Sequence, residues 1–310
     1  MESLNRTALD LVDEAIDFAD ELNLVVHASE GDATVLDFGV EVPGGLEAGQ
    51  LLAEIQTAGL SSVHTRLDEV AGAPLTYVDL STDHPAMALL AGQKAGWELS
   101  VEGFEALGSG PARALVAEED EYARIGYEDD FDFAVLALEC TELPTDAAVE
   151  QVADMAGVGE SNVFLPAFRT GSVTGSVIAA ARAAETAVFR LSELGYDPLQ
   201  ILSVNGTAPV APVGGDEQTA IARTTDALAY GAQVHLVVEA DSPRFEDVPS
   251  TAHEEYGTPL AAVFEDVDWD FYEIPESVFG PAQVTIDVVG GPTHVYGDTH
   301  EDVLAESFEL

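Results

Sequence analysis

Lys94 is the only lysine in a chain of 310 residues that carries 58 acidic side chains. Its ammonium is a compact, movable charge that can give up a proton, whereas an arginine guanidinium effectively never does. Arg182 and Glu185 lie three residues apart, so on a helix their side chains would share one face and could pair. A carboxylate held beside a guanidinium is also placed to take a proton from water. We therefore treat Lys94, Arg182 and Glu185 as candidate catalytic residues.

Each candidate also has a purely structural interpretation. Lys94 could be a cation at the C-terminal end of a helix, where the helix dipole stabilises it by about 0.3–1 kcal/mol, and by less in concentrated salt. An exposed Arg182–Glu185 pair would contribute only about 0.2–0.5 kcal/mol. The helix around the pair has a core-facing stripe and an apolar neighbouring face: Val177, Ala181, Ala184, Val188 and Leu191, then Ile178 and Phe189. This pattern favours a pair that faces a cleft over one that faces bulk water.

The charge of the chain indicates the solvent in which it works. A formal net charge of −48 would make a compact domain repel itself at ordinary ionic strength. At about 1 M salt the Debye length falls to about 3 Å, and neighbouring charges are screened. We therefore expect a protein that requires concentrated K⁺ or Na⁺ salt. With 47% hydrophobic residues the chain should fold, and without a basic stripe it should bind no nucleic acid.

The expected elements indicate an α+β fold. Residues 3–23 form an amphipathic helix that is neither a signal peptide nor a membrane span, so we expect a cytoplasmic protein without a membrane partner. The length allows two domains, 1–143 with Lys94 and 144–310 with the Arg182–Glu185 pair. We expect strands at 24–28, 34–40, 75–80, 133–139, 162–167, 233–238 and 282–289, helices at 46–58, 86–94, 145–156, 172–194 and 217–230, and loops around 109–113 and 205–216.

Common cofactor and metal motifs are missing from the sequence. Gly214-Gly215 is not followed by the lysine of a phosphate-binding loop, and no GxGxxG follows an expected strand. No GxSxG nucleophile elbow occurs either. The histidines form no HxxxH pair, so we expect no bound metal. Cys140 is the single cysteine, which rules out an internal disulfide.

Nine short segments stand out in order along the chain. They are Val42-Pro43-Gly44-Gly45, Thr82-Asp83-His84-Pro85-Ala86, Gln93-Lys94-Ala95-Gly96-Trp97, Ser109-Gly110-Pro111-Ala112-Arg113-Ala114, Gly175-Ser176-Val177 with Arg182-x-x-Glu185-Thr186, Ala208-Pro209-Val210-Ala211-Pro212, Arg223-Thr224-Thr225-Asp226-Ala227, Tyr230-Gly231, and Val248-Pro249-Ser250 with Tyr256-Gly257. Together they resemble the methenyltetrahydromethanopterin cyclohydrolase family, here in a halophilic archaeal form. The resemblance implies a cytoplasmic homotrimer whose subunit has two α+β domains facing each other across a deep substrate pocket, without a metal or organic cofactor. It also implies reversible hydrolysis of 5,10-methenyltetrahydromethanopterin to 5-formyltetrahydromethanopterin, a step of one-carbon metabolism.

The resemblance gives each catalytic candidate a role. The methenyl carbon of the substrate is an amidinium-like cation between N5 and N10, so the enzyme must deliver water, remove its proton and help one nitrogen leave. By resemblance, Glu185 would orient and deprotonate the water, and Arg182 would hold Glu185 ionised and aimed. Lys94 would stabilise developing charge or transfer a proton near the departing N10.

Five further residues would bind substrate by the same resemblance. Arg113 would contact an anionic part of the carrier tail, with Ser109 and Gly110 adding hydroxyl and backbone contacts. Arg223 and Asp226 would contact the pterin. The structural alternatives are a surface position for Arg113 and, for Arg223 and Asp226, a simple i, i+3 ion pair.

The chain departs from the family pattern at two places. Thr225 stands where asparagine is expected, and residues 164–170 differ from the family's usual form. Both changes leave the catalytic candidates intact and put the carrier tail in question, so methenyltetrahydrofolate is an alternative carrier. A non-catalytic homologue that binds a pterin and a hydrolase of another cyclic amidine are the further alternatives.

Overall fold

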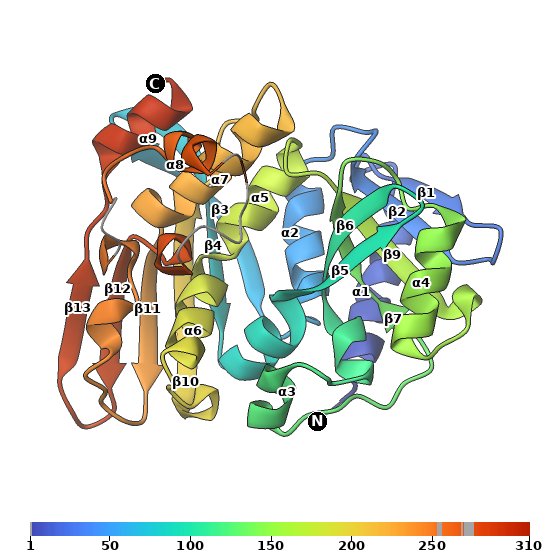
Figure 1. Ribbon diagram of the computed structural model, residues 1–310, viewed down its shortest axis with the longest axis horizontal. Helices are drawn as coiled ribbons and strands as arrows, with labels where there is room; N and C mark the ends of the chain where they lie inside the picture. The colour runs from blue at the N-terminus through green and yellow to red at the C-terminus, as the bar shows by residue number, and fades with distance from the viewer. Residues whose placement is uncertain (1, 253–255, 268, 270–275) are drawn as a thin grey trace. The chain divides into compact units, whose positions relative to one another are not determined.

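The computed structural model describes residues 2–252, 256–267, 269 and 276–310. It contains two mixed sheets together with helices, which confirms the expected α+β class (Figure 1). The chain divides into two compact units, Met1–Ser62 with Ala86–Gly175 and Val63–Pro85 with Ser176–Leu310. These units differ from the expected domains, because an early hairpin pairs with a strand that lies far along the sequence.

The first unit is built on a sheet of seven strands among the described residues. The strands are β1 Val25–Ala28, β2 Thr34–Gly39, β5 Ala95–Val101, β6 Phe104–Ser109, β7 Ala134–Val135, β8 Ala137–Cys140 and β9 Val163–Phe168. Their order is β1-β2-β9-β8-β6-β5, with β7 also paired to β9. Strands β2, β7 and β8 run parallel to β9, whereas the β1–β2, β6–β8 and β5–β6 pairs are antiparallel.

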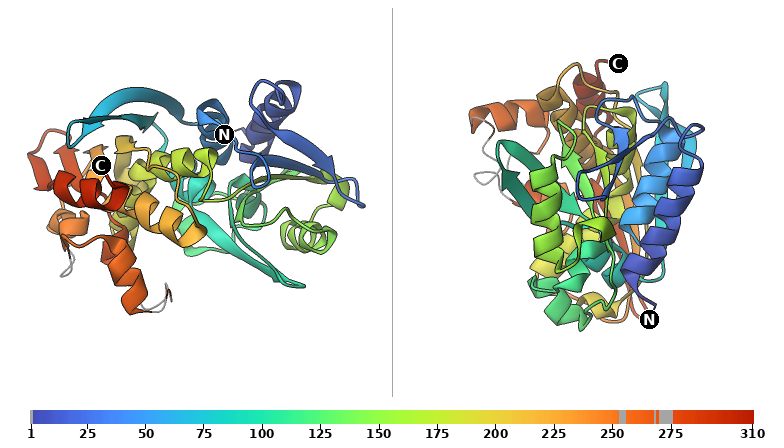
Figure 2. Two further views of the ribbon diagram at one scale, coloured as in Figure 1. Left: turned by 90° about the horizontal axis from the view of Figure 1, so that it is seen from above. Right: turned by 90° about the vertical axis from the view of Figure 1, so that its right-hand side faces the viewer.

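Helices cover both faces of this sheet. They are α1 Leu4–Asp17, α2 Leu46–Gln56, the π-helix Ala86–Gln93, the 3₁₀-helices Pro111–Leu115 and Glu160–Asn162, α3 Asp120–Ile125 and α4 Asp146–Ala156. Figure 2 shows α1 and α2 on one face of the sheet and α4 on the other. Ser3 caps α1 by accepting a hydrogen bond from the Arg6 amide, and Thr145 caps α4 in the same way. The buried Ala8, Val12 and Ala15 form the inner face of α1.

The second unit is built on a sheet of six strands among the described residues. The strands are β3 Ser62–Val70, β4 Ala73–Thr82, β10 Ile201–Pro209, β11 Gln233–Val238, β12 Gln283–Val288 and β13 Thr293–Gly297. Their order is β13-β12-β11-β10-β4-β3. Strands β11 and β12 are parallel, whereas the β10–β11, β4–β10 and β12–β13 pairs are antiparallel.

The helices of the second unit pack along its sheet and against one another. They are α5 Val173–Ala181, which begins at the junction of the units, α6 Ala183–Glu193, α7 Glu217–Gly231, α8 Leu260–Asp266 and α9 Glu301–Phe308, with 3₁₀-helices at Pro198–Gln200, Phe245–Asp247, Ser250–Ala252 and Glu276–Phe279. Helix α6 lies against β10, β11 and β4, and α7 packs with α8 and α9. The core under α7 contains Tyr230, Phe264, Leu304 and Phe308, all of them buried.

The structure corrects several expected elements. The helix expected over 172–194 is two helices, because Arg182 leaves the regular helical path between α5 and α6 with φ −83° and ψ −1°. The segment expected as a helix over 86–94 is a π-helix, and α1 ends at Asp17 rather than at residue 23. The expected loop 205–216 is wrong over its first residues, because β10 runs to Pro209, and β6 extends into the expected loop 109–113 as far as Ser109.

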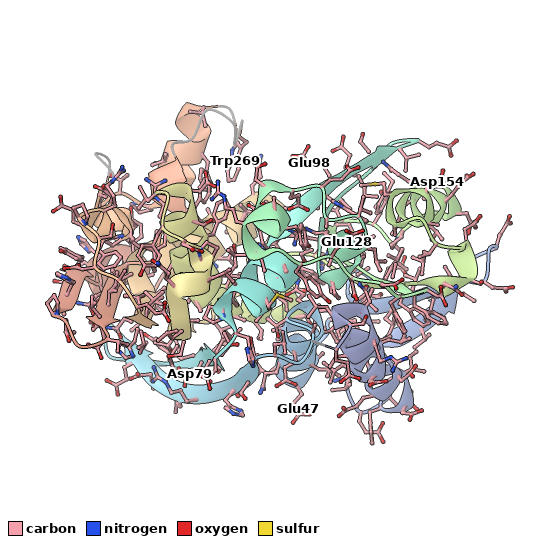
Figure 3. All side chains as sticks on the ribbon, turned by 90° about the horizontal axis from the view of Figure 1, so that it is seen from below. Glu47, Asp79, Glu98, Glu128, Asp154 and Trp269 are labelled. Atoms are coloured by element: carbon pink, nitrogen blue, oxygen red, sulfur yellow. The ribbon has the colours of Figure 1, made fainter. Side chains whose placement is uncertain are left out.

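Acidic residues lie on the outside of the first unit. Glu47, Glu98, Glu128 and Asp154 are exposed, and Figure 3 shows them spread over different elements. Among the described residues, no helix is both long enough and apolar enough to cross a membrane.

Candidate active site

Arg182 and Glu185 form the ion pair that their spacing predicts. Arg182 Nε donates to Glu185 Oε2 over 3.0 Å, and only 6% of the Glu185 side chain is exposed. Glu185 lies in the first turn of α6, where the helix dipole favours a negative charge. The other carboxylate oxygen, Oε1, has no hydrogen-bond partner among the described residues. A largely buried carboxylate that is held through one oxygen is placed to accept a proton from a water molecule through the other.

The first turn of α6 is set by close contact with β10. Gly206 in β10 pairs with Leu80 on one side and Val234 on the other. A Cβ atom added at Gly206 would lie 2.6 Å from the Ala184 amide nitrogen, so only glycine allows the strand this near to the helix. Ala184 directly precedes Glu185, and the strand therefore fixes the height of the carboxylate above the sheet.

Lys94 follows the π-helix directly and lies between two carboxylates. Its amide donates to the Leu89 carbonyl over 2.7 Å. The Nζ atom lies 3.4 Å from Glu119 Oε2 and 3.1 Å from Glu121 Oε1, and 17% of the lysine side chain is exposed. The ammonium is thus held in a partly buried ion-pair network.

Arg113 is fully buried and is bound entirely within the first unit. Its Nε and Nη2 donate to the two oxygens of Glu119 over 2.8 and 2.5 Å. Its remaining donors reach three main-chain carbonyls at the end of the π-helix, those of Leu90, Gly92 and Lys94. These contacts use all five N–H groups that a guanidinium has. The alternative of a surface arginine is wrong, since 0% of the side chain is exposed.

The charged groups of this cluster shift one another's pKa values. Burial opposes ionisation of Glu119, but the hydrogen bond and charge of Arg113 and the charge of Lys94 hold the Glu119 pKa below its ordinary value. For Arg113, burial lowers the pKa, and the hydrogen bond and charge of Glu119 outweigh it and raise the pKa. Both groups are therefore charged at neutral pH.

Ser109 and Gly110 join the same region from the end of β6. The Ser109 hydroxyl is buried and accepts a hydrogen bond from Gln56 Nε2 over 2.7 Å. The Gly110 amide donates to the Gly92 carbonyl over 2.9 Å, and its φ of 118° suits glycine. The four residues that the sequence places in the first unit, Lys94, Ser109, Gly110 and Arg113, thus lie around the end of one π-helix.

Arg223 and Asp226 lie on α7 and hold the C-terminal helix. Arg223 Nε donates to the Ser307 carbonyl over 2.9 Å, and the fully buried Asp226 accepts from Ser307 Oγ over 2.6 Å and from the Leu260 amide over 2.9 Å. The alternative of an ion pair between Arg223 and Asp226 is wrong, because each binds other partners. Burial raises the pKa of Asp226 to about 7, although the hydrogen bonds from Ser307 and Leu260 lower it.

Sequence reasoning missed Glu119, Glu121 and Gly206. Glu119 and Glu121 lie in the acidic run 118–121, and in a chain with 58 acidic residues such a run has the composition of any solvated surface. Gly206 lies inside the segment that we expected to be a loop, and a glycine in a loop needs no further structural explanation. Only the non-local pairing of β10 and the ion pairs of Lys94 distinguish these residues.

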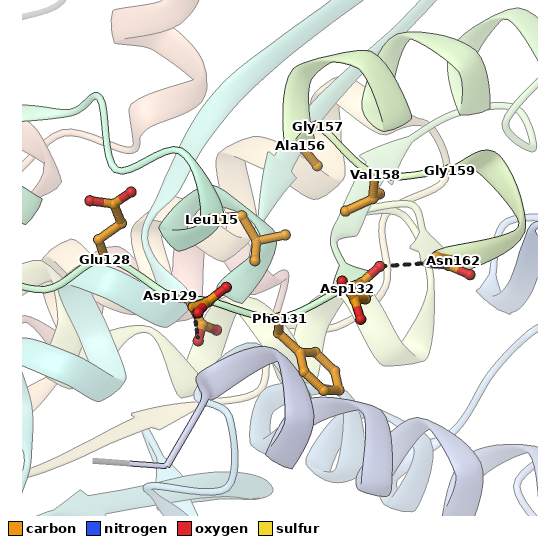
Figure 4. Close-up of a pocket in the computed structure, with 11 residues that line it drawn as sticks. Leu115, Glu128, Asp129, Phe131, Asp132, Ala156, Gly157, Val158, Gly159 and Asn162 are labelled. Atoms are coloured by element: carbon orange, nitrogen blue, oxygen red, sulfur yellow. Dashed lines mark hydrogen bonds between the residues drawn. The ribbon is translucent and has the colours of Figure 1, made fainter.

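A separate cavity of about 660 Å³ lies within the first unit. Figure 4 shows it between the segment 128–132 and the turn 156–159, with Leu115 and Asn162 at its wall. Asn162 Nδ2 donates to the main-chain carbonyl of Asp132 over 3.0 Å. None of the residues that the sequence predicts for the site lines this cavity. Across the described part of the chain, no three His, Cys, Asp or Glu side chains come together in a way that could hold a metal ion.

Comparison with known proteins places the chain in a family. A protein of Halobacterium salinarum named methenyltetrahydromethanopterin cyclohydrolase is 59% identical over 310 residues, which cover 100% of each chain. Proteins of the same name from Methanospirillum hungatei and Methanocella arvoryzae are 38% and 39% identical and cover 99% of this chain and 99% and 98% of their own. A model of the family described as Cyclohydrolase (MCH) matches residues 3–308. The chain therefore belongs to the cyclohydrolase (MCH) family of enzymes.

Proposed function

We propose that this enzyme hydrolyses 5,10-methenyltetrahydromethanopterin to 5-formyltetrahydromethanopterin, in a reversible step of one-carbon metabolism. The observation that carries the proposal is the 59% identity, over the whole length of both chains, with the Halobacterium salinarum protein of that name. The Arg182–Glu185 pair and Lys94 supply the residue types that the chemistry needs. Methenyltetrahydrofolate is the alternative carrier, because residues 164–170 depart from the family pattern.

The reaction consists of an addition and an elimination. Water adds to the cationic methenyl carbon, and loss of one proton from that water leaves a neutral carbinolamine. The C–N10 bond then breaks as N10 takes up a proton and the hydroxyl group loses one, which leaves a formyl group on N5. One proton is released overall. The enzyme therefore needs a base for the water and a group that can give a proton to N10.

Glu185 is the base in this proposal. Its side chain is 6% exposed, its Oε2 is fixed by Arg182, and its Oε1 has no partner among the residues that the structure describes. A water bound at Oε1 would be held in one orientation and would pass its proton to the carboxylate as it attacks. The negative charge also favours binding of the cationic substrate.

Lys94 assists the departure of N10 in this proposal. Its ammonium can donate a proton to N10 and recover one from the hydroxyl group, or it can stabilise negative charge on the oxygen. An arginine could do only the second. This difference gives a chemical reason for a single lysine in a chain that otherwise uses only arginine as its strong cation.

Ser109, Gly110, Arg113, Arg223 and Asp226 stay predictions as substrate contacts. Each of these residues forms hydrogen bonds within its own unit. Each therefore also stabilises the segment that would carry its contact with the substrate. The guanidinium of Arg113 would have to exchange one of its five bonds before it could bind an anionic tail.

We further propose a cytoplasmic homotrimer that needs molar salt and no metal or organic cofactor. The net charge of −48 supports the salt requirement, because screening is needed to keep the acidic surface from repelling itself. Trimerisation would bury surface between subunits and so reduce the number of carboxylates that must be solvated.

The test is to identify the product formed in ¹⁸O-labelled water. Purified protein in molar KCl is incubated with methenyltetrahydromethanopterin beside an enzyme-free blank, and the product is separated by chromatography and weighed by mass spectrometry. We expect enzyme-dependent 5-formyl product with one ¹⁸O atom in the formyl group. A 10-formyl product, or no product above the blank from folded protein, would contradict the proposal.

A further inference from the structure

We propose that Glu119 is the positioning residue for Lys94, and that Arg113 holds Glu119 in a space left open by Gly96. The inference rests on the proposed role of Lys94 in the hydrolysis. It assigns Arg113 to the placement of the catalytic lysine through Glu119.

The ammonium of Lys94 needs an external anchor. A lysine side chain carries about 2 kcal/mol of rotamer entropy, so a reactive position must be held by contacts. Glu119 Oε2 at 3.4 Å and Glu121 Oε1 at 3.1 Å provide two such contacts, and the residues lie two positions apart at the start of α3. Glu119 Oε2 is at the same time the oxygen that Arg113 Nη2 binds over 2.5 Å.

Arg113 holds both ends of this arrangement. One edge of its guanidinium binds the Glu119 carboxylate through two parallel bonds, the geometry in which such pairs are strongest. Its Nη1 donates to the main-chain carbonyl of Lys94 itself and to that of Gly92. The same buried side chain therefore fixes the backbone of Lys94 and the carboxylate that binds its ammonium.

Gly96 leaves the room that the Arg113–Glu119 pair occupies. A Cβ atom at this position would lie 2.5 Å from Glu119 Oε2 and 2.7 Å from Arg113 Nε. Any side chain two residues beyond Lys94 would thus displace the pair. The spacing Lys94-Ala95-Gly96 is explained by this contact.

The network also solves an electrostatic problem of the reaction. The substrate is a cation, and a lone ammonium beside it would repel it. Two carboxylates, Glu119 and Glu121, lie against the two cations Lys94 and Arg113, and their negative charges offset this repulsion. Replacing Glu119 by glutamine would remove both the anchor and one of these negative charges.

The single lysine allows a direct test of its placement. Protein grown with lysine labelled with ¹³C at the ε carbon has one lysine side-chain signal, that of Lys94. In molar KCl we expect an ordered signal in the wild type, measured by ¹³C relaxation. We expect a shifted and more mobile signal in Glu119→Gln and in Gly96→Ala, and an unchanged one in Glu118→Gln, which alters an exposed neighbour. An unchanged Lys94 signal in both Glu119→Gln and Gly96→Ala would overturn the proposal.

Kinetics separates positioning from a general structural role. We expect Glu119→Gln to lower kcat by about 10-fold or more with little change in KM, because misplacement of a reacting group acts on the chemical step. In a Lys94→Ala background the same change should have less than about a twofold further effect, since it acts only through the lysine. Equal effects of Glu119→Gln in both backgrounds would overturn the proposal. The NMR experiment needs no turnover, so it still decides the placement of Lys94 if the proposed function fails.

Discussion

Arg182 Nε lies 3.0 Å from Glu185 Oε2 across the break between α5 and α6, and the pair is held against β10 at the contact of Ala184 with Gly206. A regular helix through residue 182 would also have placed the two side chains on one face. The break places Glu185 in the first turn of a new helix, where the helix dipole favours a carboxylate. The geometry therefore combines a guanidinium bonded to one carboxylate oxygen, a helix start, and a second carboxylate oxygen without a hydrogen-bond partner among the described residues.

Glu185→Gln should remove most of the turnover. The amide keeps the size of the side chain but cannot take a proton from water, and a positioned base contributes about 10²–10⁴-fold to such a step. We expect kcat to fall by at least about 100-fold with a melting temperature close to that of the wild type. Glu193→Gln, at an exposed position on the same helix, is the matched control and should keep full activity. Turnover of Glu185→Gln within a few-fold of the wild type would exclude the base role.

Gly206→Ala should weaken both the fold and the active site. The added methyl group would lie 2.6 Å from the Ala184 amide nitrogen and would push the first turn of α6 away from β10. Overpacking of this kind costs about 1–3 kcal/mol. We expect lower thermal stability together with a lower kcat, because Glu185 moves with the turn. Gly215→Ala is the control, since a Cβ atom there meets nothing within 4 Å. Equal melting temperatures for the two variants would show that the strand is not tightly apposed to the helix.

Asp226→Asn should change how stability depends on pH. Burial raises the pKa of Asp226 to about 7, whereas an unfolded aspartate titrates near about 3.9. The folded state therefore binds more protons between these values, and this group makes the protein less stable as pH rises from about 4 to about 7. An asparagine can still accept from the Leu260 amide and donate to Ser307 Oγ, without this titration.

The measurement is denaturant unfolding of both proteins in molar KCl at about pH 5 and about pH 8. Relative to the wild type, Asp226→Asn should gain on the order of 2–4 kcal/mol between these pH values, because each pKa unit corresponds to about 1.36 kcal/mol. The same pH dependence in the two proteins would mean that Asp226 does not titrate in this range.

Local patterns explain which elements could be predicted. The amphipathic spacing of α1 and the apolar strand at Val234, Leu236 and Val238 can be recognised without the rest of the fold. Strand β3 could not be predicted, because most of its residues are exposed and buried and exposed residues do not alternate along it. The division into units depends on the pairing of Val78 with Ala208, which joins residues too distant in sequence for any local pattern.

The candidate site was partly predictable for the same reason. The Arg182–Glu185 pair follows from helical spacing, and it forms as predicted. The break at Arg182 does not follow from the sequence, because alanines stand on both sides of it and favour a continuous helix. The partners of Lys94 were hidden by composition, since an acidic residue carries no positional signal in so acidic a chain.

Dilution into low salt should unfold the protein or dissociate its subunits. At about 0.1 M salt the Debye length is about 10 Å, so the carboxylates of a chain with net charge −48 repel one another across the surface. Circular dichroism and sedimentation, followed from molar KCl to dilute buffer, should both change over the same salt range. Full secondary structure and an unchanged assembly in dilute buffer would disprove the salt requirement.

The central claim is tested most directly by the loss of methenyl absorbance on adding purified enzyme in molar KCl. Methenyltetrahydromethanopterin and methenyltetrahydrofolate are compared in parallel, each against an enzyme-free blank. The account predicts rapid enzyme-dependent loss of absorbance with methenyltetrahydromethanopterin. Loss of absorbance with methenyltetrahydrofolate alone would show that the folate carrier is the substrate. No loss above the blank with either carrier, from protein that is folded by circular dichroism, would contradict the proposed function.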